Sequence, residues 1–507
     1  MNKFILLLNT LKYLKSKQIY YRLYYFIRKK IKGYNYPLLL PSNPKELVFN
    51  NFINNYTSFE NNTFTFLNLS KKFDEIDWNY SEFGKLWTYN LNYFDYLNQK
   101  NISQEKGLKL IYDFIDNLQN IKDGLEPYPT SLRGINWIKF LIKHKIKDKK
   151  IDNSLLAQYY ILYDNLEYHL LGNHLLENGF SLLWGGVYFD DKKLLAKAKE
   201  ILYDELNEQI LDDGGHFELS PMYHQIIFYR LLDAIQLVDK NLNDTELLNF
   251  LTNKASKMQC WLKNITFSNG EIPLLNDSAN KIAPTSKQLF DYCDYLNISK
   301  ENLKLIDSGY RKITKNNYEC IVDIGKIGPD YIPGHAHADT FSFVLNIDNK
   351  PFIVDTGIST YEIGEVRDYE RSTNAHNTIE INDTNSSQVW GGFRVANRAE
   401  VFDIDIKNDI ILAKHNGYKN FGIIHQRTWQ FSENKIIIID NLNQKTKAVF
   451  RLHFHPKIIK QEIKNKIKTN KEFKIVQNYI AFEYNKRILT NVVEIEFEQE
   501  LKVEINI

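Results

Sequence analysis

Histidine and aspartate residues gather in one stretch of the second half of the chain. His335 and His337 lie two positions apart in Pro-Gly-His-Ala-His-Ala-Asp, and Asp355 and His376 follow. On a strand, residues at i and i+2 point to the same face. Two histidines and one aspartate from such a group are a suitable ligand set for zinc with an open position. Core histidines satisfied by hydrogen bonds, and an aspartate that forms a turn, are the alternative.

An adjacent pair of polar residues, Asn173 and His174, interrupts an otherwise apolar helical stretch. Polar groups that a helix buries need compensating partners. The pair is therefore a candidate for binding or catalysis, and a helix cap or a core hydrogen bond is the alternative.

A second polar segment, Gly214–His224, places a tyrosine at the start of a predicted helix. Ser220 and Pro221 suit the N-cap and the first helical position. Tyr223 then falls in the first turn, where the positive end of the helix dipole favours a phenolate. A buried tyrosine with a tied hydroxyl is the alternative. His216 and Glu218, just before this helix, are candidate substrate-binding residues.

Aromatic and charged residues crowd the connection between Asp355 and His376. Tyr361, Arg367 and Arg371 lie there, and Trp390 and Arg394 follow. Such stretches are usually solvated loops. The position between two candidate metal ligands favours a substrate-binding role instead.

These residues lie in two regions with different periodicity. Apolar residues recur at helical spacing from about residue 70 to 310, and alternating or β-branched runs follow from about residue 316. We expect a basic amphipathic segment at 1–45, a helical toroid or solenoid at 46–315 and an antiparallel β-sandwich at 316–507. The predicted helices include residues 105–119, 131–144, 151–170, 194–211, 222–238 and 244–264. The predicted strands include residues 341–347, 351–354, 377–381, 410–413, 435–440, 448–454, 479–482 and 492–507.

The composition is that of a folded globular protein. The chain has 507 residues, 43% hydrophobic and 25% charged, which excludes a mostly disordered chain and indicates two or three domains. Residues 1–45 hold ten of the 64 Lys and Arg and no acid, which leaves 54 basic against 62 acidic residues in the rest. That balance disfavours a nucleic-acid partner. Three cysteines without CxxC spacing disfavour a disulfide framework.

Residues 4–32 combine apolar faces with basic residues at helical spacing. This pattern is typical of a helix on a membrane surface, and a helix packed on the domain with a solvated basic face is the alternative. The start of the chain lacks a cleavage-site pattern, so we expect a cytoplasmic protein or one at the inner face of a membrane, with the periplasm as the alternative.

The ordered set of motifs resembles the heparinase II/III family of polysaccharide lyases. The motifs are Asn173-His174, Ser220-Pro221-Met222-Tyr223-His224, His335-Ala336-His337-Ala338-Asp339, Val354-Asp355-Thr356-Gly357, Arg367-Asp368-Tyr369 and Arg371–Thr378. The resemblance covers roughly residues 85–455. Leu86–Phe94 and the segment from Arg133 to Trp137 look most like members encoded with surface-polysaccharide synthesis genes.

This resemblance implies an α+β protein with an N-terminal (α/α) toroid, a C-terminal antiparallel β-sandwich and an active site between them. It also implies β-elimination on a uronic-acid polysaccharide. By motif match, Asn173 and His174 neutralise the uronate carboxylate and Tyr223 protonates the leaving oxygen. His335 or Tyr361 removes the C5 proton.

The resemblance further implies a zinc, catalytic or structural, held by His337, Asp355 and His376. The predicted partner is an acidic polysaccharide. The alternatives to a lyase are a uronate C5-epimerase that uses the same proton abstraction, and a non-catalytic glycan-binding protein.

Overall fold

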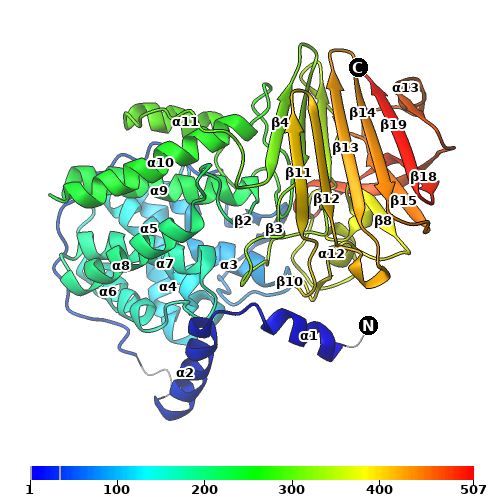
Figure 1. Cartoon of the computed structure of the whole chain (residues 1–507). Coiled ribbons are helices and arrows are strands. Elements are labelled where there is room, and N and C mark those ends of the chain that lie inside the picture. The colour runs from blue at the N-terminus through cyan, green and yellow to red at the C-terminus, as the bar shows by residue number, and fades with distance from the viewer. Residues whose placement is uncertain (1–2, 33–35) are drawn as a thin grey trace.

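The computed structural model describes residues 3–32 and 36–507. It has a helical part followed by a part built mainly of antiparallel strands, and the two lie side by side (Figure 1). The last long helix of the first part ends at Tyr295, and the first strand of the second part begins at Tyr310.

Helix pairs build the first part. Neighbours along the chain such as α7 and α8, and α9 and α10, pack on each other, and α5 packs on α7. The helices are α3 (Lys85–Tyr93), α4 (Gln104–Asn117), α5 (Pro127–His144), α6 (Lys149–Asp164), α7 (Gly172–Tyr188), α8 (Lys192–Gln209), α9 (Pro221–Asn241), α10 (Thr245–Ile265) and α11 (Ser286–Tyr295). Trp87, Trp137, Trp184 and Trp261 lie in their common core. A small sheet of β1 (Phe59–Glu60), β2 (Thr63–Phe66) and β3 (Leu69–Lys72) precedes α3.

The predicted helices are confirmed, with one overrun. The helix expected over residues 151–170 ends at Asp164. Residues 165–171 are an irregular connection instead. Within it, the Glu167 backbone amide donates to the Asn178 side chain in α7, and the Asn178 amide nitrogen donates to the Glu167 carboxylate. The helix ends early because of this tertiary contact, which the pattern of apolar residues does not reveal.

Three antiparallel sheets form most of the second part. Their orders are β4-β5-β6-β7, β17-β18-β15-β8 and β11-β12-β13-β14-β19-β16. The strands are β4 (Tyr310–Thr314), β5 (Tyr318–Asp323), β6 (Phe343–Ile347), β7 (Lys350–Ile353), β8 (Ile379–Ile381), β11 (Val401–Lys407), β12 (Ile410–His415), β13 (His425–Ser432), β14 (Lys435–Leu442), β15 (Ala448–His453), β16 (Ile467–Thr469), β17 (Lys474–Glu483), β18 (Lys486–Phe497) and β19 (Glu500–Asn506). Short elements complete it: α12 (Glu365–Glu370), α13 (Lys460–Lys466), β9 (Val389–Trp390) and β10 (Arg394–Val395).

Alternating burial along β13 and β14 confirms the expected pattern of strands with one buried face. The single strand expected over residues 492–507 is wrong, because β18 and β19 belong to different sheets and the chain crosses between them at residues 498–499. Apolar residues from all three sheets, among them Leu345, Phe450 and Val503, share one core.

The N-terminal segment forms α1 (Lys3–Leu11) and α2 (Ser16–Lys32). Figure 1 shows both helices along one edge of the molecule, outside the two main parts. Among the described residues, no helix has the length and apolar character needed to cross a bilayer.

Candidate active site

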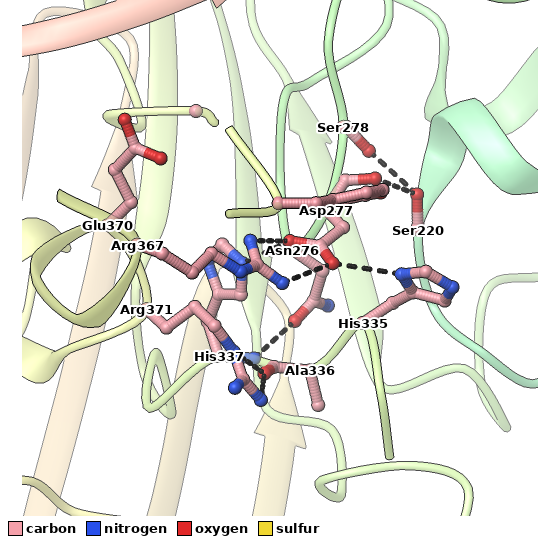
Figure 2. A network of polar contacts seen from close by, with 12 residues as sticks. Ser220, Asn276, Asp277, Ser278, His335, Ala336, His337, Arg367, Glu370 and Arg371 are labelled. Atoms are coloured by element: carbon pink, nitrogen blue, oxygen red, sulfur yellow. Dashed lines mark hydrogen bonds and ion pairs between the residues drawn. The ribbon is translucent and has the colours of Figure 1, made fainter. Parts of the chain in front are cut away.

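Asp277 is the centre of the polar network where the two parts meet. It lies in the connection between α10 and α11 and is completely buried. Arg367 donates to both carboxylate oxygens at 2.5 and 2.7 Å, and His335 and His337 contact one oxygen each at 2.9 and 2.8 Å. Burial alone would raise the pKa of Asp277, but Arg367 and the histidine hydrogen bonds hold that pKa well below its usual range. Asp277 is therefore an anion that orients three side chains (Figure 2).

The expected strand at His335 and His337 is wrong. Both residues lie in the irregular connection between β5 and β6. The loop is held because the Asp277 amide donates to the His335 carbonyl and the His337 amide donates to the Asn276 side chain. Both histidines still contact the same carboxylate, one at each oxygen of Asp277.

One ring nitrogen of His335 is bound to Asp277, and the other can accept a proton. Its Nδ1 lies 2.9 Å from Oδ2 of Asp277, and an ionised carboxylate can only accept, so Nδ1 carries the proton. Nε2 is then the basic nitrogen, and it lies 3.8 Å from Oε2 of Glu218. Figure 2 shows Arg367 and His335 on opposite sides of Asp277.

Tyr223 lies against His335 from the helical part. Its ring stacks on the imidazole with 4.0 Å between centroids. The predicted helix start is confirmed: Ser220 is the N-cap of α9, its Oγ accepts from the Tyr223 amide, and Pro221 is the first helical residue. Burial raises the pKa of Tyr223 above its ordinary value, so the protonated hydroxyl is favoured although the residue lies in the first turn of α9.

Tyr361 approaches from the sheet part, with its hydroxyl 3.2 Å from that of Tyr223. The rings of Phe393 and Tyr484 pack edge-on against it, and the Arg367 guanidinium lies 4.9 Å from its centroid. Burial and the Asp277 charge raise the pKa of Tyr361 well above its ordinary value. Both tyrosines are therefore protonated near neutral pH and suited to donate protons.

Asn173 and His174 lie in the first turn of α7, as predicted for a helix. Gly172 precedes them at φ +60°, and a Cβ there would lie 3.1 Å from Oε1 of Glu218, so the turn into α7 requires glycine. The Asn173 amide nitrogen lies 2.9 Å from both oxygens of Glu218. The same carboxylate lies 3.8 Å from Nε2 of His335, so Glu218 lies between the amide and the imidazole.

Glu167 positions His174. Its Oε1 lies 2.9 Å from Nδ1 of the ring, and the ring packs on Tyr128. Burial works against the charged ring, but the Glu167 carboxylate outweighs it and raises the pKa of His174. The side chain stays 31% exposed, so Nε2 can serve a ligand.

The predicted substrate-binding residues divide into buried supports and surface residues. Glu218, Arg367, Arg371 and His216 are at most 1% exposed. Arg371 donates to the Ala336 and Gly392 carbonyls, and His216 contacts Gln209. We expected these four residues to contact the substrate directly, but they are buried. They support the residues of the site through hydrogen bonds instead.

Trp390 and Arg394 lie at the surface. The Arg394 guanidinium is 4.8 Å from the Trp390 ring, and the indole nitrogen donates to Thr10 of α1. This contact joins the N-terminal segment to the loop that carries Phe393.

The predicted metal ligands lie close to one another. His376 contacts Asp355 through Nδ1 at 2.8 Å, and the His337 and His376 rings are 5.2 Å apart. Nδ1 of His337 and Nε2 of His376 are buried without a hydrogen-bond partner. Within residues 3–32 and 36–507, no three His, Cys, Asp or Glu side chains are already arranged around a common metal position.

Sequence reasoning missed Asp277 and Glu167, although each binds a histidine that it identified. Asp277 stands in Leu-Leu-Asn-Asp-Ser between two helices, where a polar run resembles an ordinary loop. Glu167 was hidden because the helical pattern continues across it. A buried carboxylate needs partners, but which partners depends on the tertiary fold.

The fold and site define a protein in which a helical part and an antiparallel sheet part jointly form a buried cluster of tyrosine and histidine side chains. Comparison with known families identifies the chain. The model described as "Heparinase II/III N-terminus" matches residues 139–304, and the model "Heparinase II/III-like, C-terminal" matches residues 298–494. The chain belongs to the heparinase II/III family.

Similar proteins include two named heparin-sulfate lyase. The one from Bacteroides stercoris is 24% identical over 342 residues, covering 59% of this chain and 49% of its own length. The one from Pedobacter heparinus is 22% identical over 308 residues, covering 55% and 45%. The chain thus spans about half the length of these curated relatives in the matched regions.

Solved structures share the fold. A crystal structure of heparinase III aligns with a TM-score of 0.66 at 16% identity, covering 86% of this chain and 80% of that one. The heparinase III BT4657 gene product aligns with a TM-score of 0.59 at 18% identity, covering 86% and 81%. The helical toroid followed by an antiparallel β-sandwich, as predicted, is therefore the fold of this chain.

Proposed function

We propose that this protein is a polysaccharide lyase that cleaves a uronic-acid-containing polysaccharide by β-elimination. The observation that carries the proposal is the group formed by His335, Tyr223 and Tyr361, in which a ring nitrogen and two protonated hydroxyls meet between the two parts. The heparin-sulfate lyases among the relatives support an acidic, heparin-like substrate.

In this mechanism His335 is the base. Asp277 holds the proton on Nδ1, so Nε2 can take the C5 proton of the uronate. The electron pair of the C5–H bond forms the C4–C5 double bond as the bond from C4 to the leaving oxygen breaks. Tyr223 donates its proton to that oxygen. Tyr361 is a weaker candidate for the base, because its raised pKa makes the phenolate scarce.

Negative charge grows on the uronate carboxylate as the C5 proton leaves. Asn173 and a protonated His174 would lie against it, and preorganised donors stabilise such charge most in the transition state. Glu167 supports this role, since it raises the pKa of His174 and so favours the charged ring.

The stacking of Tyr223 on His335 favours elimination over epimerisation. Groups whose rings lie 4.0 Å apart serve one face of a sugar. An epimerase must return a proton to the opposite face from the one that lost it.

The orphaned ring nitrogens support a zinc site. His337, Asp355 and His376 would hold the ion, because neutral imidazoles and a carboxylate are its usual ligands. A bound zinc would supply a fixed positive charge that keeps the loop carrying His335 in place.

The proposal is tested by absorbance at the unsaturated-uronate band while the protein acts on a panel of uronic-acid polysaccharides, with and without sulfation. A rise that Tyr223→Phe abolishes is the expected result and identifies the substrate class. Solvent deuterium at C5 without any rise would overturn the lyase in favour of an epimerase. Binding without either change would leave a glycan-binding protein. A role in surface-polysaccharide metabolism stays a prediction.

A further inference from the structure

The N-terminal helices present an apolar surface that the rest of the molecule does not cover. Twelve of the 28 exposed large apolar or aromatic side chains in the described ranges belong to α1 and α2. On α2, Ile19, Leu23, Phe26 and Ile27 are 44–58% exposed, and Ile31 is 76% exposed. Contiguous exposed apolar patches of this kind mark interaction sites.

The opposite face of α2 is already occupied. Gln18 and Arg22 donate to the carbonyls of Leu170 and His169, and Tyr25 donates to that of Leu166. Residues 18, 22 and 25 share one side of a helix, whereas 19, 23, 26 and 27 lie on the other. One face of α2 is therefore held against the helical part, and the exposed apolar residues lie on the other, outward face.

α1 repeats this arrangement. Leu6 is buried and Thr10 accepts from Trp390, while Phe4, Leu7, Leu8 and Leu11 are 38–63% exposed. Figure 1 shows α1 and α2 along the same edge of the molecule. The two outward faces together form what we call the N-terminal surface, defined by the exposed side chains of residues 4–31.

The positive charge of this segment indicates an anionic partner. Residues 3–32 contain nine Lys or Arg and no acid. Lys15 and Arg28 bind the helical part, but Lys3, Lys12 and Lys30 are exposed beside the apolar stripes. An apolar helical face bordered by lysine and tyrosine matches the boundary between anionic headgroups and acyl chains.

We propose that the N-terminal surface docks the protein on an anionic membrane, with α1 and α2 lying in the plane of the interface. Both helices contact segments that border the active site. α2 packs on residues 166–170, which carry the Glu167 partner of His174, and α1 bonds to Trp390, three residues before Phe393. A docked molecule therefore holds the active-site edge near the lipid. If the proposed function holds, its substrate is a polysaccharide at the membrane surface.

The experiment is co-sedimentation of the full-length protein with phosphatidylcholine vesicles that contain or lack phosphatidylglycerol. The double variant Leu23→Glu/Phe26→Glu tests the surface. Ile404→Glu/Ile406→Glu is the matched control, because these β11 side chains are 46% and 43% exposed on the sheet part. We expect binding to anionic vesicles only, at least a tenfold weaker partition for the α2 variant, and wild-type partition for the control.

Three results would overturn the proposal. They are no binding by the wild type, equal binding by the α2 variant, and a concentration-dependent dimer that the α2 variant dissolves, which would assign the surface to a second copy. The assay needs no turnover, so it is independent of the proposed function. Lyase activity on a soluble polysaccharide is measured in parallel, and the α2 variant should retain it.

Discussion

Asp277 lies 2.9 Å from Nδ1 of His335, although one residue belongs to the helical part and the other to the sheet part. The carboxylate also binds Arg367 through both oxygens. The orientation of the proposed base therefore depends on contacts between the two parts.

Asp277→Asn should lower kcat by about two to four orders of magnitude, because an amide can stabilise the wrong imidazole tautomer. It should also lower the free energy of unfolding by about 3–5 kcal/mol, since Arg367 is left buried without its counter-ion. Steady-state kinetics and denaturant unfolding measure the two effects.

Asp440→Asn is the matched control for this variant. Asp440 is equally buried and binds His425 and Arg427 within the β-sandwich. The Asp440→Asn variant should be destabilised to a similar degree, yet it should keep the wild-type kcat at temperatures where it is folded. Equal kcat losses in both variants would refute the orienting role of Asp277.

Tyr223→Phe should lower kcat by about 10²- to 10⁴-fold with a small change in KM, because it removes the proton donor and keeps the ring that packs on His335. Tyr318→Phe removes another partly buried hydroxyl bond, to the Ser432 carbonyl, and should leave kcat unchanged. An active Tyr223→Phe enzyme would transfer the acid role to Tyr361.

The His174–Glu167 pair should stabilise the fold more at low pH. Because the pKa of His174 is raised in the folded protein, its contribution is fully present below the unfolded pKa of about 6.5 and is lost as the pH rises through the folded value. The loss of stability in His174→Gln should therefore shrink as the pH rises above about 6.5.

The contribution of His455 to stability should depend on pH in the opposite direction. Burial lowers its pKa, so the neutral ring is favoured in the folded protein and its contribution is lost as the pH falls. The effect of His455→Gln should grow with pH. Chemical unfolding as a function of pH compares the two variants, and parallel pH profiles would contradict the assignment for His174.

Purified protein should contain about one zinc per chain by elemental analysis, as the proposed ligand set requires. His376→Ala should abolish it, and His455→Ala, outside that set, should retain it. Full metal content in His376→Ala would remove His376 from the zinc site.

Several residues that the structure brings together in the candidate site could be selected from the sequence because their types and local context are informative on their own. Tyr223 stands after a recognisable helix start, and His335 stands in a paired motif. Asp277, Glu167 and the burial of Arg367 could not, because each depends on which distant segment lies opposite. The raised pKa of Tyr223 could not be predicted for the same reason, because the burial that raises it depends on the tertiary fold.

The contact between Tyr223 and His335 also makes the chemistry sensitive to rotation of one part against the other. The proposed acid comes from α9 and the proposed base from the loop after β5, so a rotation of one part against the other would separate them. If the two parts opened wide enough to admit or release a polymer, Tyr223 and His335 would separate and the site would be inactive. Cleavage would then be confined to the closed arrangement, and an open molecule could move along its substrate without cutting it.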